Sequence, residues 1–527
     1  MRGLLKFLLF LLVLALAGGA AAWLWSPRAE GPGIDLRQPD RFIGQATPLD
    51  LRVEAPGGRF ARVDVTLEQG GRSFPVFALA QPAQGDVRQE SAERLYIMRT
   101  VGKREIPELQ PGPARLVVRA ARPVLFGLRE AESVAARDVE VRLDPPRIAV
   151  LSTLHYINHG GAELVVYRAT PTDVESGVRV GDQTYPGFPA SGAGIAADES
   201  TKVAFFALLH DQDLNTPISL YARDPAGNEA AAPLDYRAFP KPFARSRIDI
   251  DDRFLQQVVP AIAATTPDMG LSTAPGDLPM SFLRINGELR MRNSRTIAEL
   301  ARKTTPQMHW KDAFQPLTNA AVEARFADNR TYFYRGTEID RQVHLGFDLA
   351  VTERIPVLAA HNGIVIHAGD LGIYGNTVVI DHGLGVQSLY AHLSSMDVKT
   401  GDRVEKGHPI GRSGMTGLAA GDHLHFTMLV GGHPVNPVEW WDPKWMQDRV
   451  LRKIAEAGSP ATAVRQRRTA SPVLARRVAR ATRPRPSRGC VTAGPPTRVR
   501  VGVPAAGSPP CTPARWGAIM NGRRESE

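Results

Sequence analysis

The segment Val343–Met428 constrains the fold of this chain more than any other part, because its apolar, strand-like runs carry or precede histidines. The run His-Leu-His-Phe-Thr-Met-Leu-Val predicts a strand, and residues two apart on a strand point to the same face. We therefore expect His423 and His425 side by side. His392 follows the strand pattern Val386–Tyr390 and is expected across the site from them.

These residue types suggest a catalytic metal. A catalytic zinc ion takes three ligands from protein and leaves its fourth position to water. His344, Asp348 and His425 can supply those three ligands. A neutral histidine beside the bound water can take its proton or stabilise charge on an attacked carbonyl, and His392 and His423 are the candidates. The pattern predicts metal-assisted hydrolysis.

Most other histidines are expected to be structural, because a single histidine is more often a core or surface residue than a ligand. His155 and His159 have the spacing of a helical metal pair, but their context is not helical and offers no acidic residue between them. We expect the same structural role for the remaining histidines near the predicted site, which are His361, His367, His382, His408 and His433.

Four motifs follow one another in this region. They are His-x-x-x-Asp at 344–348, Tyr-Gly-Asn-x-Val-x-Ile-Asp-His-Gly at 374–383, Tyr-Ala-His-Leu at 390–393 and His-Leu-His-Phe at 423–426. Their types and order resemble the lysostaphin and LytM-type zinc metallopeptidases. The resemblance covers Phe314–Pro437.

The resemblance implies a compact antiparallel β fold with a groove and cleavage of peptide bonds in bacterial peptidoglycan. It implies one zinc ion (Zn2+) held at His344, Asp348 and His425, with His392 and His423 as catalytic histidines. Members that only activate other wall hydrolases lack some metal ligands, whereas this chain has all three. A non-catalytic wall-binding or amidase-activating module is the alternative.

Two details of the resemblance concern neighbouring residues. Thr427 stands where many relatives carry an acidic residue, and we expect it to touch no ligand. A tyrosine upstream of the first ligand often assists the transition state in this family. The spacing does not decide between Tyr332 and Tyr334.

The residues before the peptidase region predict β structure, since a chain of this length needs several cores. Residues 27–144 alternate apolar and polar side chains, as in Leu49–Glu54, and predict a β-sandwich-like domain. The pair Pro145-Pro146 marks a boundary. Residues 145–245 predict a second β domain, and the turn Asp224–Asn228 with its preceding strand resembles bacterial immunoglobulin-like repeats. The expected fold is mainly β, with two immunoglobulin-like β-sandwich modules before the peptidase domain.

Residues 246–310 predict a short helical connector packed on a peptidase domain at 311–445, with a lid over the groove as the alternative. Asp251 or Asp252 is the expected N-cap of one helix, and Ser294 or Thr296 that of another.

Residues 1–26 predict a membrane anchor, because Phe7–Trp25 is uncharged and contains tryptophans suited to a membrane interface. A signal peptide cleaved near Ala20–Ala22 is the alternative and would give a secreted protein. Basic residues before the span place the N-terminus in the cytoplasm and the rest outside it, at the periplasmic side of an inner membrane. The expected partners are the membrane and peptidoglycan peptide stems, and a regulatory protein is not identified.

The charge of the chain is concentrated at its end. From Val450 onward there are 16 Lys and Arg against 3 Glu, a net +13, so the preceding residues carry −3 although the whole chain carries +10. We therefore expect no nucleic-acid partner. The composition of residues 446–527 predicts a disordered Arg- and Pro-rich tail, and both cysteines, Cys490 and Cys511, lie there.

Overall fold

The computed structural model describes residues 2–25, 29–55, 57, 59–82, 85–350 and 352–458. Within them the chain is mainly β, as predicted. The predicted disorder from residue 459 onward and both cysteines lie outside the described residues.

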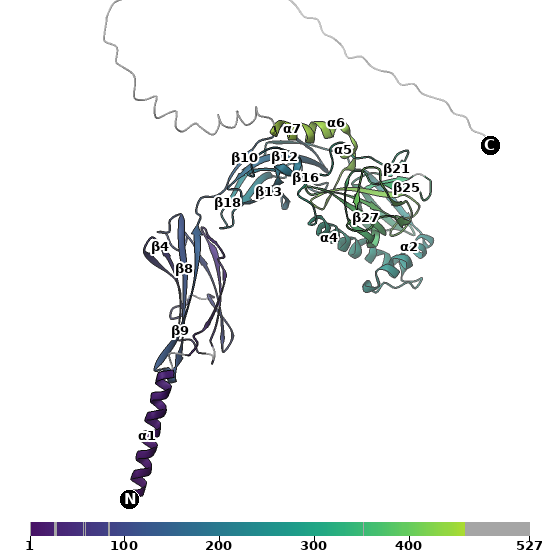
Figure 1. Cartoon of the computed structure of the whole chain (residues 1–527). Coiled ribbons are helices and arrows are strands. Elements are labelled where there is room, and N and C mark those ends of the chain that lie inside the picture. Colours follow the sequence, from purple (N-terminus) through teal and green to yellow (C-terminus); the bar gives the residue numbers. More distant parts are fainter. Residues whose placement is uncertain are drawn as a thin grey trace, which may run out of the picture. The chain divides into compact units, whose positions relative to one another are not determined.

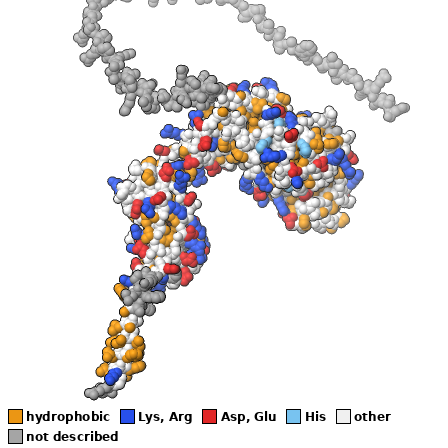
Figure 2. Space-filling model, viewed as in Figure 1, with side chains coloured by type: hydrophobic (Ala, Val, Ile, Leu, Met, Phe, Trp, Pro, Cys, Tyr) orange, Lys and Arg blue, Asp and Glu red, His pale blue; other side chains and the backbone are white. Residues whose placement is uncertain are grey.

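The N-terminal apolar segment is a single helix, α1 (Arg2–Trp25). Its window Gly3–Ala20 is long and apolar enough to cross a membrane, and none of that window is buried. Figure 2 shows hydrophobic side chains along the visible face of this helix. An exposed apolar helix at this position fits either a membrane anchor or a signal sequence.

The first β module packs two sheets around one core (Figure 1). In β3, Leu49, Leu51 and Val53 are buried while the residues between them are not, which confirms the predicted alternation. The first sheet has the order β1 (Gly33–Gln38), β3 (Thr47–Glu54), β7 (Arg94–Val101), β6 (Val87–Ser91). The second has the order β2 (Phe42–Ile43), β9 (Arg129–Val141), β8 (Gly112–Val124), β4 (Arg62–Gln69), β5 (Arg72–Ala78), with the short helix η2 (Leu125–Gly127) between β8 and β9.

The second β module contains two four-stranded sheets and one parallel strand pair. One sheet has the order β10 (Arg147–Val150), β12 (Gly161–Thr170), β16 (Thr201–Leu208), β15 (Phe188–Pro189). The other has the order β14 (Gln183–Pro186), β13 (Glu175–Val180), β17 (Ile218–Arg223), β18 (Glu229–Pro233). The parallel pair is β11 (His155–Asn158) and β19 (Tyr236–Phe239), and η3 (Ala190–Ala193) follows β15. That either module is immunoglobulin-like stays a prediction.

The peptidase region is built on an antiparallel sheet, as the resemblance implied. Its order is β21 (Ala321–Ala324), β24 (Phe347–Ala350), β32 (Leu424–Val430), β28 (Val386–Ala391), β27 (Asn376–Gly383), β26 (Gly363–Asp370), β30 (Arg403–Val404), with β33 (His433–Val435) paired to β32. A smaller sheet has the order β25 (Pro356–Leu358), β31 (Pro409–Arg412), β29 (Ser395–Met396), and η6 (Gly372–Tyr374) precedes β27.

The connector is tied to the peptidase region by a strand. This strand, β20 (Arg245–Ile250), pairs in parallel with β22 (Asp328–Tyr334), which pairs with β23 (Thr337–His344). The helical elements that follow are α2 (Asp252–Thr265), η4 (Pro267–Met269), α3 (Leu278–Arg284), the π-helix η5 (Ile285–Leu289) and α4 (Arg290–Ala301). Their apolar residues share a core with Tyr332 and Ile373 of the peptidase region, so the connector packs on it as predicted.

One of the two helix starts predicted in the connector is confirmed, and the other is wrong. Asp251 is the N-cap of α2 and accepts a hydrogen bond from the backbone N–H of Phe254 at 2.8 Å. The expectation for Ser294 and Thr296 was wrong. Both lie inside α4, and their hydroxyls donate to the carbonyls four residues earlier. The helix begins earlier because α3, η5 and α4 run on without a break.

The second β module and the peptidase region share one hydrophobic core. Trp440 lies at their junction, with its ring 5.9 Å from that of Phe205 in β16 and 5.8 Å from that of Trp310. The buried ammonium of Lys453 donates to the buried carboxylate of Glu163 at 2.7 Å. Residues 446–457, which the composition placed in the tail, are helical and pack against this module. The C-terminal elements are α5 (Pro437–Trp441), α6 (Pro443–Trp445), the π-helix η7 (Met446–Leu451) and α7 (Arg452–Ala457).

Candidate metal centre and catalytic cavity

The three predicted metal ligands come from three strands, two of which are paired in one sheet. His344 is the last residue of β23, Asp348 lies in β24 and His425 lies in β32. Asp348 and His425 are directly paired across the antiparallel ladder, so their side chains stand on the same face of the sheet. All three side chains are buried.

Their ligand atoms converge on one point. Nε2 of His344 and Nδ1 of His425 both lie 2.9 Å from Oδ1 of Asp348, and the two nitrogens lie 3.0 Å from each other. Two imidazole nitrogens and a carboxylate oxygen match the ligand types that zinc prefers. The residues present therefore fit a bound zinc ion.

Hydrogen bonds on the far side of each imidazole select the tautomer that a metal needs. Nδ1 of His344 lies 3.2 Å from the carbonyl of Arg325, to which it can only donate, so Nε2 keeps its lone pair. The Thr427 hydroxyl donates to the carbonyl of Leu345 and thereby accepts from Nε2 of His425 at 3.1 Å, which leaves Nδ1 free of a proton. The expectation that Thr427 touches no ligand was wrong.

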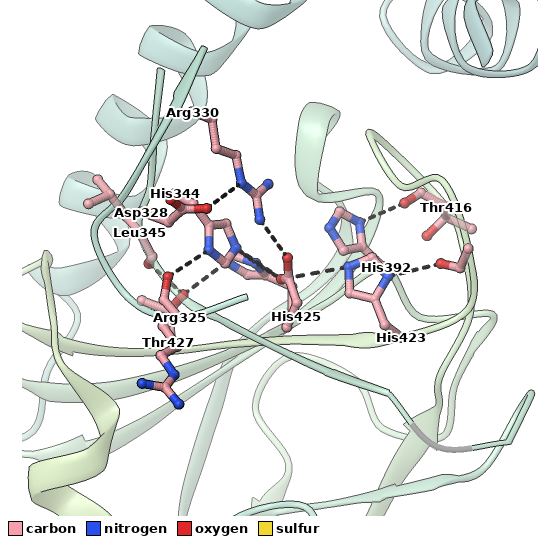
Figure 3. A network of polar contacts seen from close by, with 12 residues as sticks. Arg325, Asp328, Arg330, His344, Leu345, His392, Thr416, His423, His425 and Thr427 are labelled. Carbon is pink, nitrogen blue, oxygen red and sulfur yellow. Dashed lines mark hydrogen bonds and ion pairs between the residues drawn. The ribbon is translucent and has the colours of Figure 1, made fainter. Parts of the chain in front are cut away.

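Arg330 holds the second oxygen of Asp348. Its Nη2 donates to Oδ2 of Asp348 at 3.0 Å, and its Nε lies 3.5 Å from Asp328 (Figure 3). Burial would raise the pKa of Asp348, but His344 and His425 outweigh burial and hold this pKa well below its usual range. Asp348 is thus a carboxylate with Oδ1 turned to the ligand cluster.

The two predicted catalytic histidines lie next to this cluster and next to each other (Figure 3). The ring centroids of His392 and His423 are 4.8 Å apart, and Nε2 of His423 lies 3.6 Å from Oδ1 of Asp348. Nδ1 of His392 donates to the carbonyl of Thr416 at 2.8 Å, and Nδ1 of His423 donates to that of Gly421 at 2.9 Å. These bonds place a proton on Nδ1 of each ring and favour the tautomer that leaves Nε2 as the acceptor.

His392 is held in a strained conformation. Its φ of 62° lies in the left-handed region, which costs a non-glycine residue roughly 1 kcal/mol or more. Its backbone N–H donates to the carbonyl of Tyr374 at 2.9 Å. Burial lowers the pKa of His392 well below its usual range, and burial lowers that of His425 to about 4. Both rings are neutral at pH 7.

A cavity of about 500 Å³ contains all five predicted site residues. Tyr332 also lines it, whereas Tyr334 lies elsewhere and donates its hydroxyl to Asp252 at 2.6 Å. The spacing did not decide between the two tyrosines, and the structure places Tyr332 rather than Tyr334 at the cavity. Tyr374 is a further member, with its ring centroid 5.4 Å from that of His425.

The histidines that the sequence predicted to be structural lie outside this cavity. His382 is buried between the Asn362 carbonyl and the Ser388 hydroxyl, each 2.7 Å away. His155 bonds Ser152, and His159 bonds the carbonyl of Gln212. These rings are satisfied by protein groups, as expected of structural histidines.

Sequence reasoning missed Arg330, Tyr374 and Arg290, all of which line the cavity. Tyr374 opens one of the four motifs and could have been considered from its position there. No local pattern marks either arginine, because each reaches the cavity only through the packing of separate segments.

Residues 342–437 match the model of peptidase family M23. The DD-carboxypeptidase/endopeptidase Mpg of Neisseria meningitidis is 43% identical over 97 residues, which are 18% of this chain and 22% of that protein. The peptidoglycan DD-endopeptidase ShyA of Vibrio cholerae is 41% identical over 96 residues, again 18% of this chain and 22% of the relative.

The matched part spans about a fifth of the length of these relatives. The catalytic domain of lysostaphin from Staphylococcus simulans is 26% identical, with 27% of this chain and 96% of that chain covered and a TM-score of 0.18.

Proposed function

We propose that this chain, whose residues 342–437 form a domain of peptidase family M23, is a zinc-dependent endopeptidase that hydrolyses peptide crosslinks of bacterial peptidoglycan. The observation that carries the proposal is the convergence of Nε2 of His344, Nδ1 of His425 and Oδ1 of Asp348 in a cavity that also contains His392 and His423. Relatives named as peptidoglycan endopeptidases support the substrate class.

A zinc ion held by these three residues would polarise the scissile carbonyl and make a water molecule acidic enough to attack near neutral pH. Nε2 of His423, which lies beside Asp348, is placed to accept the proton of the attacking water. Once protonated, the same group can return the proton to the leaving amine.

His392 and Tyr332 complete the proposed machinery. His392 presents its Nε2 to the cavity from the strained position that its bond to Thr416 fixes, and it shares the proton transfer with His423. The Tyr332 hydroxyl is the proposed donor to the oxygen that becomes negative when the carbonyl is attacked. The intact ligand set gives no support to a non-catalytic wall-binding or amidase-activating module.

The N-terminal helix α1 and the two β modules suggest where this chemistry occurs. An apolar helix without buried residues supports anchoring in the inner membrane, with the cavity on the periplasmic side. Secretion after cleavage of that segment is the other arrangement. The first two β modules would then act as immunoglobulin-like spacers between membrane and wall.

The test is digestion of purified peptidoglycan of defined crosslink chemistry by the full-length, zinc-loaded protein. We expect crosslinked fragments to be converted to uncrosslinked ones, as identified by mass spectrometry. Removal of zinc with a chelator should stop the reaction, and added zinc should restore it. Unchanged crosslinks with a fully zinc-loaded protein would overturn the proposal.

A further inference from the structure

The catalytic cavity has a wall that lies outside the matched peptidase domain. Phe254 of α2, Phe282 of α3 and Arg290 of α4 line the same cavity as the metal ligands. The connector therefore contributes side chains to the site as well as packing beside it. Arg290 is the charged member of the three.

Arg290 is held in place by neutral groups. Its Nη2 donates to Oδ1 of Asn286 at 2.6 Å, and its Nε donates to the Asn286 carbonyl at 3.1 Å. The Asn286 amide in turn donates to Asp340 at 2.7 Å. Both contacts of Arg290 lie within the π-helix η5, a helix type that is often found at functional sites.

Two of the other charged side chains of the cavity are matched by ion pairs. Arg330 faces Asp328 and Asp348, and Asp249 faces Arg247 at 2.7 Å. Among the described residues, Asp251 and Glu323 line the cavity without an ion-pair partner; Asp251 caps α2, and Glu323 is exposed in β21. Across the described residues, no carboxylate forms an ion pair with Arg290, so this cation has capacity for an anion from outside.

The helix that carries Arg290 packs against the turn that carries Tyr374. Asn293 of α4 accepts a hydrogen bond from the backbone N–H of Ile373 at 3.0 Å, and Arg290 and Tyr374 line the same cavity. The Tyr374 ring in turn contacts that of His425. An anion bound at Arg290 would therefore lie close to a peptide bond held at His425.

We propose that Arg290 binds a free carboxylate of the substrate next to the scissile peptide bond, and this inference rests on the proposed function. The residue on the carbonyl side has its own carboxyl group in the bond. A free carboxylate directly beside the bond is then the one on the residue that supplies the nitrogen, and this is the group that we assign to Arg290. The substrate class is a crosslinked peptide in which the amine-donating residue keeps a free carboxylate on the carbon that bears the scissile nitrogen.

Two synthetic crosslinked peptides test this inference, one with that carboxylate free and one with it converted to a carboxamide. The full-length zinc-loaded protein should show a higher kcat/KM for the free carboxylate. Arg290→Met should lower kcat/KM about 10- to 100-fold for the carboxylate peptide, because a charge-assisted hydrogen bond is lost. It should change kcat/KM for the carboxamide peptide by less than about threefold. The preference for the carboxylate peptide over the carboxamide peptide should therefore disappear.

Arg295→Met is the matched control, since Arg295 is exposed on the same helix α4 and does not line the cavity. It should behave as the parent protein does toward both peptides. An equal loss on both peptides with Arg290→Met, or an unchanged preference, would overturn the role of Arg290. A zinc-loaded parent protein that cleaves neither peptide nor intact peptidoglycan would instead overturn the proposed function.

Discussion

Two buried polar clusters in this molecule are built on opposite principles. In the proposed metal cluster of His344, Asp348 and His425, groups that can all accept hydrogen bonds face one another. In the junction cluster of Glu163, Glu439 and Lys453, each group meets protein partners of the opposite kind. The metal cluster is arranged for a ligand, whereas the junction cluster is arranged for the fold.

Each charged group of the junction cluster has hydrogen-bond partners within the protein. The carboxylate of Glu439 accepts from the Asn158 amide at 2.6 Å and from the backbone N–H of Ala162 at 2.9 Å. Lys453 donates to Glu163 and also to the Leu164 carbonyl at 3.0 Å. Substitutions in the two clusters should therefore separate loss of activity from loss of stability.

The largest effect on activity is expected from the metal cluster. His344→Ala, Asp348→Ala or His425→Ala leaves two protein ligands, too few for a catalytic zinc, so both bound metal and hydrolysis should be lost. Metal content by mass spectrometry beside a peptidoglycan-hydrolysis assay measures both. The exposed His408→Ala is the control and should keep both. Zinc and activity retained in Asp348→Ala would contradict the ligand assignment.

A smaller loss is expected from the histidines beside the cluster. His392→Ala or His423→Ala should retain close to one zinc per chain while turnover falls by about a hundred- to ten-thousand-fold, because proton transfer is lost. The same two measurements apply. An empty metal site in His423→Ala would show that His423 is a ligand rather than a catalyst.

Substitutions in the junction cluster should lower the stability of the fold. Lys453→Met leaves the Glu163 carboxylate buried without its ammonium partner and should lower the free energy of unfolding by about 3–5 kcal/mol. Thermal or urea denaturation measures this loss. The double variant Glu163→Gln with Lys453→Met should recover part of it. Equal stability of Lys453→Met and the parent would show that the pair contributes little.

The junction also predicts a pH dependence. Burial raises the pKa of Glu439 to about 7, against 4.5 for the unperturbed group. The unfolded chain releases this proton near pH 4.5 and the folded chain near pH 7. Stability should therefore fall between these values as the pH rises, by up to about 3 kcal/mol. Glu439→Gln should remove this slope, which unfolding curves at pH 5, 6, 7 and 8 would test. The same slope in both proteins would assign it to another group.

The smallest effect is expected from Thr427, which orients a ligand without binding the metal itself. Thr427→Val keeps the size of the side chain but removes the acceptor for Nε2 of His425. Zinc affinity should fall about 10- to 100-fold, as measured by competition with a chelator. Thr427→Ser is the control and should stay close to the parent. Unchanged affinity in Thr427→Val would mean that the bond does not select the tautomer.

The two clusters also differ in how far the sequence could predict them. Ladder pairing places Asp348 and the strand end before His392 beside His425, so this part of the site followed from motif order and residue type. His423 lies one residue before β32 and still reaches the cavity. The alternation in β3 likewise revealed its buried face.

The junction cluster had no such signal. Lys453 lies in a basic segment whose composition resembles a solvated tail, and only its distant partner Glu163 explains its burial. Arg290 and Arg330 reach the cavity by the packing of α4 and β22, which no spacing along one segment encodes. Local periodicity reports one face of one element, whereas these contacts depend on which elements meet.

The shared core has a consequence for the order of events during synthesis. Glu163 and Lys453 are 290 positions apart, and η7 and α7 pack against β12, which is buried along most of its length. A chain that has emerged only as far as Pro437 already contains all five histidine and aspartate residues of the site, yet it leaves an apolar sheet face open to water. The protein should therefore gain its mature fold and its activity only after translation has passed Lys453. A stalled or prematurely terminated chain should have no hydrolytic activity.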